Sequence, residues 1–174
     1  VKQNYAFSDA TLNNIDFENR RVIVVTAHRR ENLGKPLENI CNALKRIVTE
    51  HEDVEVVYPV HLNPAVREVA FGILGNMPRV KLIDPLTVDE LHNAVSRSFM
   101  VMTDSGGIQE EAPALGKPVL VLRRETERPE AVAAGTVKIA GVDEDVIYNL
   151  ASELLDSKEE YMRMAHAANP YGDG

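Results

Sequence analysis

Short apolar runs rich in β-branched residues alternate with segments of helical period along most of this chain. The runs have the length and composition of buried strands, and they are RVIVVTA (21–27), VEVVYPV (54–60), VKLID (80–84), FMVMTD (99–104), PVLVL (118–122) and TVKIA (136–140). The segment 36–51 places its apolar side chains on one helical face, namely Leu37, Ile40, Cys41, Leu44, Ile47 and Val48. Buried strands that alternate with helices predict an α/β fold, a three-layer structure with a doubly wound parallel sheet.

Local signals mark several helix ends. Pro36 suits the first position of the helix over 36–51, because a helix leaves that N–H unpaired anyway. Thr87 and Glu90 have the spacing of a capping box, so a helix is expected over TVDELHNAVSRS. Gly116 and Pro118 are expected to close the helix that follows the TDSGG segment.

Composition narrows the class of protein. With 174 residues and 44% apolar residues, the chain can bury the core of one globular domain. It has no apolar run long enough to cross a bilayer, and its polar first residues lack a signal-peptide core, so we expect a cytoplasmic protein with no membrane partner. A net charge of −8 argues against a nucleic-acid partner. Cys41 is the one cysteine, which excludes a disulfide framework and a cysteine-based metal site and predicts a core position.

Polar residues cluster after four of the predicted strands. The clusters are HRREN (28–32), HLNP (61–64), DSGG (104–107) and RRETERPE (123–130). Ligands of open α/β sheets bind outside the carboxyl ends of the strands. The sequence therefore predicts a binding site at this edge of the sheet.

The turn at Ser105, Gly106 and Gly107 is the best candidate for binding an anion. It lies between a strand and a helix, where unpaired backbone N–H groups and the positive end of the helix favour a phosphate. A tight turn with no ligand is the alternative. The segment is neither a GxGxxG fingerprint nor a Walker A loop, since no lysine follows it, and this disfavours NAD binding and ATP hydrolysis.

Each of the other candidate site residues has a functional and a structural interpretation. Glu111 lies six residues after Ser105, about 9 Å along a helix, so its carboxylate could accept two sugar hydroxyls or could face solvent. His28 stands beside two arginines at a strand end, which favours a site residue over a surface histidine, whereas His61 is evenly balanced. The RRETERPE segment is either a solvated loop or an anion- or sugar-binding loop.

Five motifs in order give a resemblance that composition does not supply. TAHRRENLGKPLENI, YPVHLNP, TDSGGIQEEAPALGKPVLVLR, TERPEAVAAGT and NPYGDG closely resemble the bacterial non-hydrolysing UDP-N-acetylglucosamine 2-epimerases. That family has two Rossmann-like domains facing across a cleft, the GT-B arrangement, and this chain resembles only the second. Residues 1–20 then correspond to an interdomain connection and 21–174 to the UDP-binding C-terminal domain, with its final helix truncated.

The resemblance implies a reaction and partners. Family members interconvert UDP-GlcNAc and UDP-ManNAc for cell-envelope polysaccharide biosynthesis, by eliminating UDP to a 2-acetamidoglucal and adding it back. They use no NAD or other cofactor and no metal. The full-length enzyme is expected to be a homodimer.

The resemblance also assigns roles to residues, matched motif by motif. The matching residues imply that Ser105, Gly106 and Gly107 contact the diphosphate and that Glu111 contacts the ribose. Leu91 packs near the uracil, and His28 lies at the diphosphate and the reacting sugar, where a donor stabilises the departing UDP. Some members bind a second, activating UDP-GlcNAc between the domains, and the residues that resemble the lining of that site are Arg29, Arg30 and His61.

Departures from the family pattern limit what this chain can do alone. The carboxylates that move the proton at C2 lie mainly in the first domain, so we expect the chain to fold and to bind UDP weakly but not to epimerise. Arg124 stands where an acidic residue is more usual. Two alternatives stay open: the donor-binding domain of a GT-B glycosyltransferase and a non-catalytic nucleotide-sugar sensor. HRREN together with TERPE favours the epimerase.

Overall fold

The computed structural model describes residues 10–125 and 129–168, and its centre is one parallel sheet of six strands in the order β3-β2-β1-β4-β5-β6. The strands are β1 (Arg21–Thr26), β2 (Val54–Pro59), β3 (Val80–Ile83), β4 (Met100–Thr103), β5 (Val119–Val121) and β6 (Val137–Ile139). Val24 of β1 pairs with Val57 of β2 on one side and with Val101 of β4 on the other. The predicted doubly wound sheet is confirmed.

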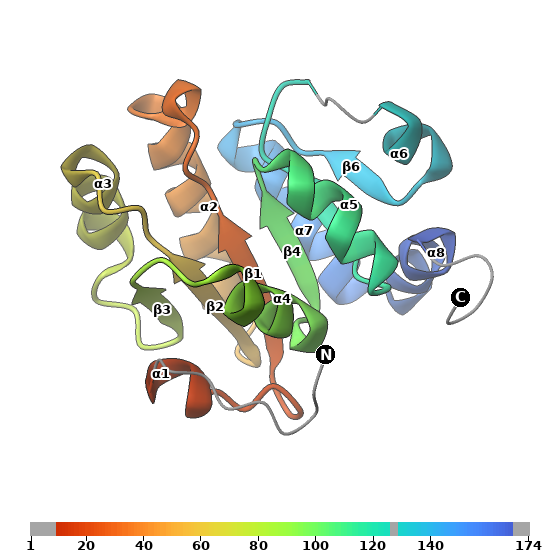
Figure 1. The fold of residues 1–174 in the computed structure, drawn as a ribbon, viewed down its shortest axis with the longest axis horizontal. Helices are drawn as coiled ribbons and strands as arrows, with labels where there is room; N and C mark the ends of the chain where they lie inside the picture. Colours follow the sequence, from red (N-terminus) through yellow and green to blue (C-terminus); the bar gives the residue numbers. More distant parts are fainter. Residues whose placement is uncertain (1–9, 126–128, 169–174) are drawn as a thin grey trace.

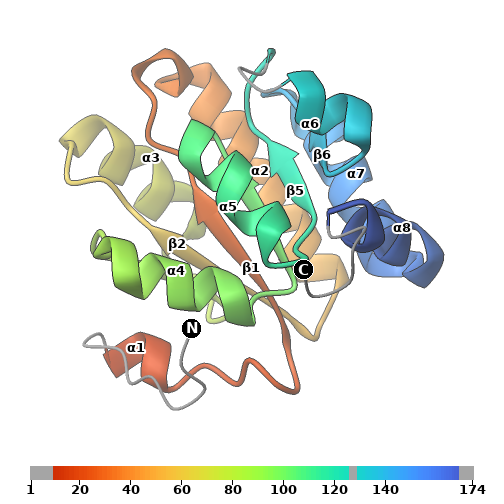
Figure 2. The same ribbon diagram turned by 45° about the vertical axis from the view of Figure 1, so that its right-hand side comes forward.

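Helices cover both faces of the sheet and make the three layers (Figure 1). α2 (Lys35–Glu50), α3 (Pro64–Leu74) and α7 (Glu144–Asp156) pack on one face, around a core that includes Ile23, Ile40 and Leu44. α4 (Val88–Arg97) and α5 (Gly106–Ala114) pack on the other face, against Val24 and Val101 (Figure 2). Because both faces are covered, the central strands are apolar on both sides.

The predicted helix ends agree with the structure to within one residue. Thr87 and Glu90 form the expected capping box at the start of α4. Pro36 is the second residue of α2 rather than the first, since the helix begins at Lys35. Gly116 follows α5 with φ of 77°, a left-handed conformation that favours glycine.

Three helices and one 3-10 turn were not predicted. They are α1 (Ala10–Asn13), η1 (Arg30–Asn32), α6 (Pro129–Ala134) and α8 (Lys158–Ala168). Leu12 of α1 and the nearby Ile15 are buried in the core cluster that also holds Val22 of β1, so part of the expected lead-in segment packs into the domain. In α8, Met164 is buried and Tyr161 stacks on Phe99.

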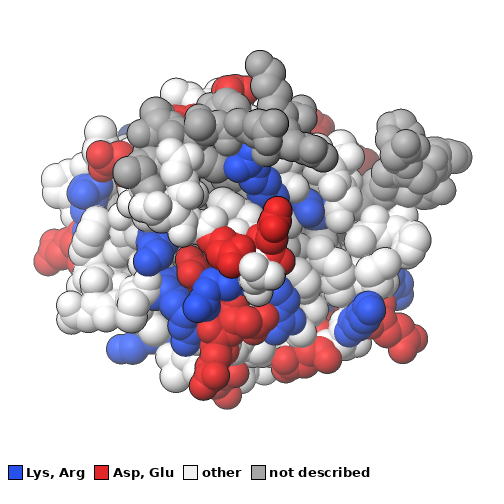
Figure 3. All heavy atoms as spheres, turned by 90° about the horizontal axis from the view of Figure 1, so that it is seen from below, with Lys and Arg blue, Asp and Glu red and all other residues white. Residues whose placement is uncertain are grey.

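Cys41 lies in the core, as predicted. Its side chain is fully buried in α2, and burial raises the pKa of the thiol to about 12. In the part of the chain that the structure describes, no helix is long and apolar enough to cross a membrane. On the surface seen from below in Figure 3, basic and acidic side chains lie next to one another.

Candidate functional site

The predicted edge of the sheet contains a topological switch point between β1 and β4. From β1 the chain continues to β2 and β3 in one direction, whereas β4 continues to β5 and β6 in the other. Loops that leave two such strands diverge and open a crevice between them. The HRREN segment follows β1 and the DSGG segment follows β4, so the two strongest candidate motifs lie on opposite sides of this crevice.

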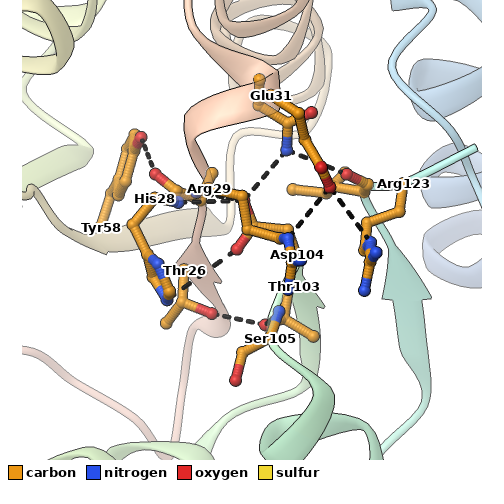
Figure 4. Close-up of polar contacts among 12 residues, drawn as sticks. Thr26, His28, Arg29, Glu31, Tyr58, Thr103, Asp104, Ser105 and Arg123 are labelled. Atoms are coloured by element: carbon orange, nitrogen blue, oxygen red, sulfur yellow. Dashed lines mark hydrogen bonds and ion pairs between the residues drawn. The ribbon is translucent and has the colours of Figure 1, made fainter. Parts of the chain in front are cut away.

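Hydroxyl groups join the two strands at the crevice floor. Thr26 and Thr103 are paired residues of β1 and β4, and their Oγ1 atoms are hydrogen-bonded at 2.6 Å (Figure 4). The backbone N–H of Ser105 donates to Oγ1 of Thr103 at 2.9 Å. Behind them, Tyr58 donates its hydroxyl to the carbonyl of Ala27 at 3.1 Å, and burial raises the pKa of Tyr58, which keeps this donor protonated. The floor is therefore a fixed, hydrogen-bonded surface.

Asp104 ties the loop after β1 to the turn after β4. Its side chain is fully buried, and Oδ2 accepts three hydrogen bonds: from the backbone N–H of His28 at 3.0 Å, from that of Arg29 at 2.9 Å, and from Nδ2 of Asn32 at 3.0 Å. The amide of Asn32 also donates to the carbonyl of Leu122 at 3.2 Å. One carboxylate thus fixes the position of the whole HRREN segment.

The turn at Ser105, Gly106 and Gly107 has the expected form. Ser105 is the N-cap residue of α5, and its side chain makes no capping hydrogen bond. The first N–H groups of a helix have no acceptor within the helix. Apart from its chain neighbours and the backbone of its own helix, the nearest described atom to a Cβ added at Gly107 is Oγ of Ser105 at 4.0 Å, so the protein itself does not require glycine there. Both features suit a ligand that approaches the backbone closely.

A cavity of about 200 Å³ opens beside this turn. The residues that line it come from the ends of β1 and β2, from the loops after β1, β2, β3 and β4, and from α4 and α5, and they are Thr26, His28, Pro59, His61, Pro85, Leu86, Leu91, Ser105 and Ile108. Four predicted site residues, His28, His61, Leu91 and Ser105, therefore meet at one cavity. Its wall combines a polar turn with apolar side chains, a composition typical of small-molecule sites.

Glu111 lies farther along α5 and is not among the described residues that line this cavity. Its side chain is partly exposed and pairs through Oε1 with Nδ1 of His92 on α4. No motif in the sequence around His92 marks it as a site residue. The pair holds the Glu111 carboxylate at the surface between the two helices, where it can accept further hydrogen bonds.

The charged residues after β1 and β5 largely pair with one another. Oε1 of Glu31 accepts a hydrogen bond from Nε of Arg29 at 3.0 Å, and the same oxygen lies 3.5 Å from Nε of Arg123 (Figure 4). Arg30 is exposed in η1, and Arg124 lines a separate cavity of about 500 Å³ near the start of α2. Residues 126–128 of the RRETERPE segment lie outside the described residues.

Among residues 10–125 and 129–168, no three His, Cys, Asp or Glu side chains come together in a group that could hold a metal ion.

Comparison with known proteins covers the whole chain. The sequence model of the family described as UDP-N-acetylglucosamine 2-epimerase matches residues 1–174. The UDP-N-acetylglucosamine 2-epimerase of Bacillus subtilis is 61% identical over 154 residues, which is 88% of this chain and 40% of that protein. The structure of S. aureus MnaA with UDP is 50% identical with a TM-score of 0.91, over 100% of this chain and 47% of that one. The structure of a Neisseria meningitidis UDP-GlcNAc 2-epimerase bound to UDP-GlcNAc is 44% identical with a TM-score of 0.88. This match covers 95% of this chain and 44% of that one.

The chain spans less than half the length of each of these relatives and corresponds to their C-terminal part. The resemblance seen in the five motifs is thus confirmed, and so is the Rossmann-like fold expected for that part of a GT-B protein. Since the family's sequence model matches every residue, this chain belongs to the UDP-N-acetylglucosamine 2-epimerase family.

Proposed function

We propose that this chain is the UDP-holding half of an enzyme that interconverts UDP-GlcNAc and UDP-ManNAc by eliminating UDP and adding it back. The observation that carries the proposal is the cavity at the β1/β4 switch point, where the Ser105 turn, His28 and Leu91 meet. Relatives of the same fold have been solved with UDP and with UDP-GlcNAc. The N-terminal half of the relatives is then the partner that closes the cavity.

Each group has a role in the proposed reaction. The N–H groups of Gly106 and Gly107 and the positive end of α5 hold the diphosphate. His28, fixed through its backbone, stabilises the charge that develops on UDP as its bond to the sugar breaks. Leu91 supplies the apolar surface for the uracil, and Glu111 accepts the ribose hydroxyls. Tight retention of UDP lets it add back after the configuration at C2 has changed.

A titration of this chain with UDP tests the proposed UDP binding. The isolated half-cleft should bind UDP with a Kd of about 0.1–1 mM, or roughly −4 to −5.5 kcal/mol. Gly107→Ala should fold at least as well as the wild type, because the added methyl group meets no nearby atom and the position is helical. The same methyl group should clash with an approaching phosphate, so UDP affinity should fall. Calorimetry gives the affinity, and thermal unfolding gives the stability.

Uridine and inorganic phosphate are the control ligands for this titration. The Gly107→Ala change should weaken UDP and phosphate much more than uridine, since only the phosphate approaches the turn. Equal UDP affinity in the wild type and in Gly107→Ala would contradict diphosphate binding at this turn. Absence of saturable UDP binding to the wild type at millimolar concentration would remove the support for a preformed UDP site in this half.

We also propose that Arg29, Arg30 and His61 contribute to a second, activating UDP-GlcNAc site. His61 is exposed at the start of the segment before α3, and its Nδ1 accepts the N–H of Asn63 at 3.0 Å. Arg29 and Arg30 lie in the HRREN segment after the neighbouring strand β1, and neither is among the described residues that line the cavity. The ring of His61 thus faces the cavity from the β2 side, opposite the Ser105 turn.

His61→Ala in the two-domain protein tests this second site. The change should abolish activation by UDP-GlcNAc, because it removes a group from the second site, and it should largely spare UDP binding. Initial rates over a range of substrate concentration measure the first effect, and calorimetry measures the second. A parallel loss of activation and UDP affinity would show that His61 serves one common site.

A further inference from the structure

The two oxygens of the Asp104 carboxylate have different environments. Oδ2 accepts all three hydrogen bonds that Asp104 receives, from the N–H groups of His28 and Arg29 and from the Asn32 amide. Oδ1 is equally buried, yet no described residue donates a hydrogen bond to it. A buried carboxylate oxygen without a donor is costly, and such atoms in folded proteins generally have a specific explanation.

The imidazole of His28 lies beside this oxygen. Nε2 of His28 lies 3.9 Å from Oδ1, about 1 Å beyond a charge-assisted hydrogen bond. The His28 side chain is half-exposed, so the ring can turn, whereas its backbone is fixed by the other oxygen of the same carboxylate (Figure 4). A small rotation of the ring therefore brings the two atoms into contact without moving the loop.

We propose that Asp104 is the positioning residue of His28, its Oδ1 accepting the Nε2–H of the imidazole so that Nδ1 is turned toward the diphosphate. The pairing itself rests on the geometry above. Only the identity of the group that Nδ1 meets rests on the proposed function. In this arrangement one carboxylate does two things: Oδ2 sets the place of the histidine backbone, and Oδ1 sets which ring nitrogen carries the proton.

The arrangement suits the departure of UDP. A carboxylate behind a histidine fixes its tautomer and stabilises the imidazolium, as in the Ser-His-Asp triad. Here the imidazolium would donate Nε2–H to Asp104 and Nδ1–H to the leaving diphosphate, so the positive charge faces the developing negative charge. Because Oδ1 is fully buried, water does not compete for it in the described structure.

Other titratable and charged groups around the ring are engaged elsewhere or lie across the cavity. Arg29 pairs with Glu31, Tyr58 donates to the Ala27 carbonyl, and His61 accepts the Asn63 N–H from the opposite wall. Arg30 is exposed in η1. Among the described residues, Asp104 is the one carboxylate placed within 4 Å of the His28 ring.

Asp104→Asn separates positioning from a purely structural role. The three donors at Oδ2 require an oxygen there, so the asparagine amide should place its NH₂ group where Oδ1 was. The loop keeps its acceptor, but Nε2 of His28 now faces the NH₂ group of the asparagine. Nε2 must then be unprotonated so that it can accept a hydrogen bond. Two-bond ¹H–¹⁵N spectra of the histidine rings, with the His28 signal assigned from His28→Gln, report which nitrogen carries the proton.

We expect the Nε2–H form in the wild-type chain, both nitrogens protonated when UDP is bound, and the Nδ1–H form in Asp104→Asn. UDP affinity should fall about tenfold or more in Asp104→Asn, since a charge-assisted contact is lost, while uridine affinity changes little. Asn32→Ala is the matched control, because it removes one donor from Oδ2 and leaves Oδ1 untouched. It should lower stability and keep the wild-type tautomer.

Each outcome of these measurements supports or contradicts the pairing of Asp104 with His28. A bare Nε2 in the wild type overturns the pairing, even if Asp104→Asn fails to fold. The same tautomer in wild type and Asp104→Asn, or an equal tautomer change in Asn32→Ala, shows that Asp104 acts only through the loop and also overturns it. If the tautomer switches as expected but UDP does not bind the wild type, then the Asp104–His28 pairing stands and the proposed function fails.

Discussion

The isolated chain should convert UDP-GlcNAc to UDP-ManNAc about 10⁴-fold or more slowly than the same chain joined to the N-terminal half of its relatives. Inversion at C2 needs a base to remove the proton and an acid to return it. Of the described residues that line the cavity, none is acidic, and the histidines among them are His28 and His61. Supplying the missing carboxylates from the N-terminal half should therefore restore the reaction.

The product of the joined protein identifies the reaction. NMR or chromatography of the nucleotide sugar distinguishes an epimer from a glycosidic product made with an acceptor and from binding without chemistry. A preparation of the isolated chain carrying His28→Gln, purified in the same way, controls for contaminating epimerase. Turnover by the isolated wild type that is absent from this preparation would show that one half is sufficient and would contradict the expectation.

Asp104→Ala should lower the free energy of unfolding by about 3–5 kcal/mol. The change removes a fully buried acceptor together with the hydrogen bonds that it accepts from two backbone N–H groups and from the Asn32 amide. It also disconnects the loop after β1 from the turn after β4. In a domain of this size each kcal/mol corresponds to about 2–4 °C in Tm, so the loss should be large in a thermal scan.

Asp143→Ala is the matched control for this stability measurement. Asp143 also accepts two backbone N–H groups, those of Asp145 and Val146, but it does so at the exposed start of α7. Loss of an exposed cap should cost about 1 kcal/mol, because water replaces the acceptor. Urea unfolding of both variants gives the comparison. Similar losses in the two variants would show that burial of Asp104 adds nothing to its contribution.

The sheet could be predicted because its strands carry a strong local signal. Runs such as RVIVVTA and VEVVYPV are apolar on both faces, and the helices between them have a clear period, so both the fold class and the approximate ends were correct. α1 and α6 have four and six residues, which is too short for a period to appear. Their formation depends on packing, as with Leu12 in the core, and not on a pattern in their own residues.

The site was predictable only where a motif is local. Ser105, Gly106 and Gly107 form one turn, so their role as an anion site could be proposed from adjacent letters. Asp104 could not be recognised in this way, although it stands next to them, because its partners lie 72 to 76 residues earlier and reach it only through the pairing of β1 with β4. The contact of His92 with Glu111 likewise depends on how α4 packs beside α5.

The pairing of β1 with β4 also determines when the crevice can form during synthesis. His28 leaves the ribosome 76 residues before Asp104, and β2 and β3 are made in between. At 5–20 residues per second this interval is about 4–15 s. Throughout that time the loop after β1 is without the Asp104 carboxylate that later holds it, and the turn at Ser105 has not yet been made. The cavity at the switch point can therefore form only after β4 and the Ser105 turn have been made.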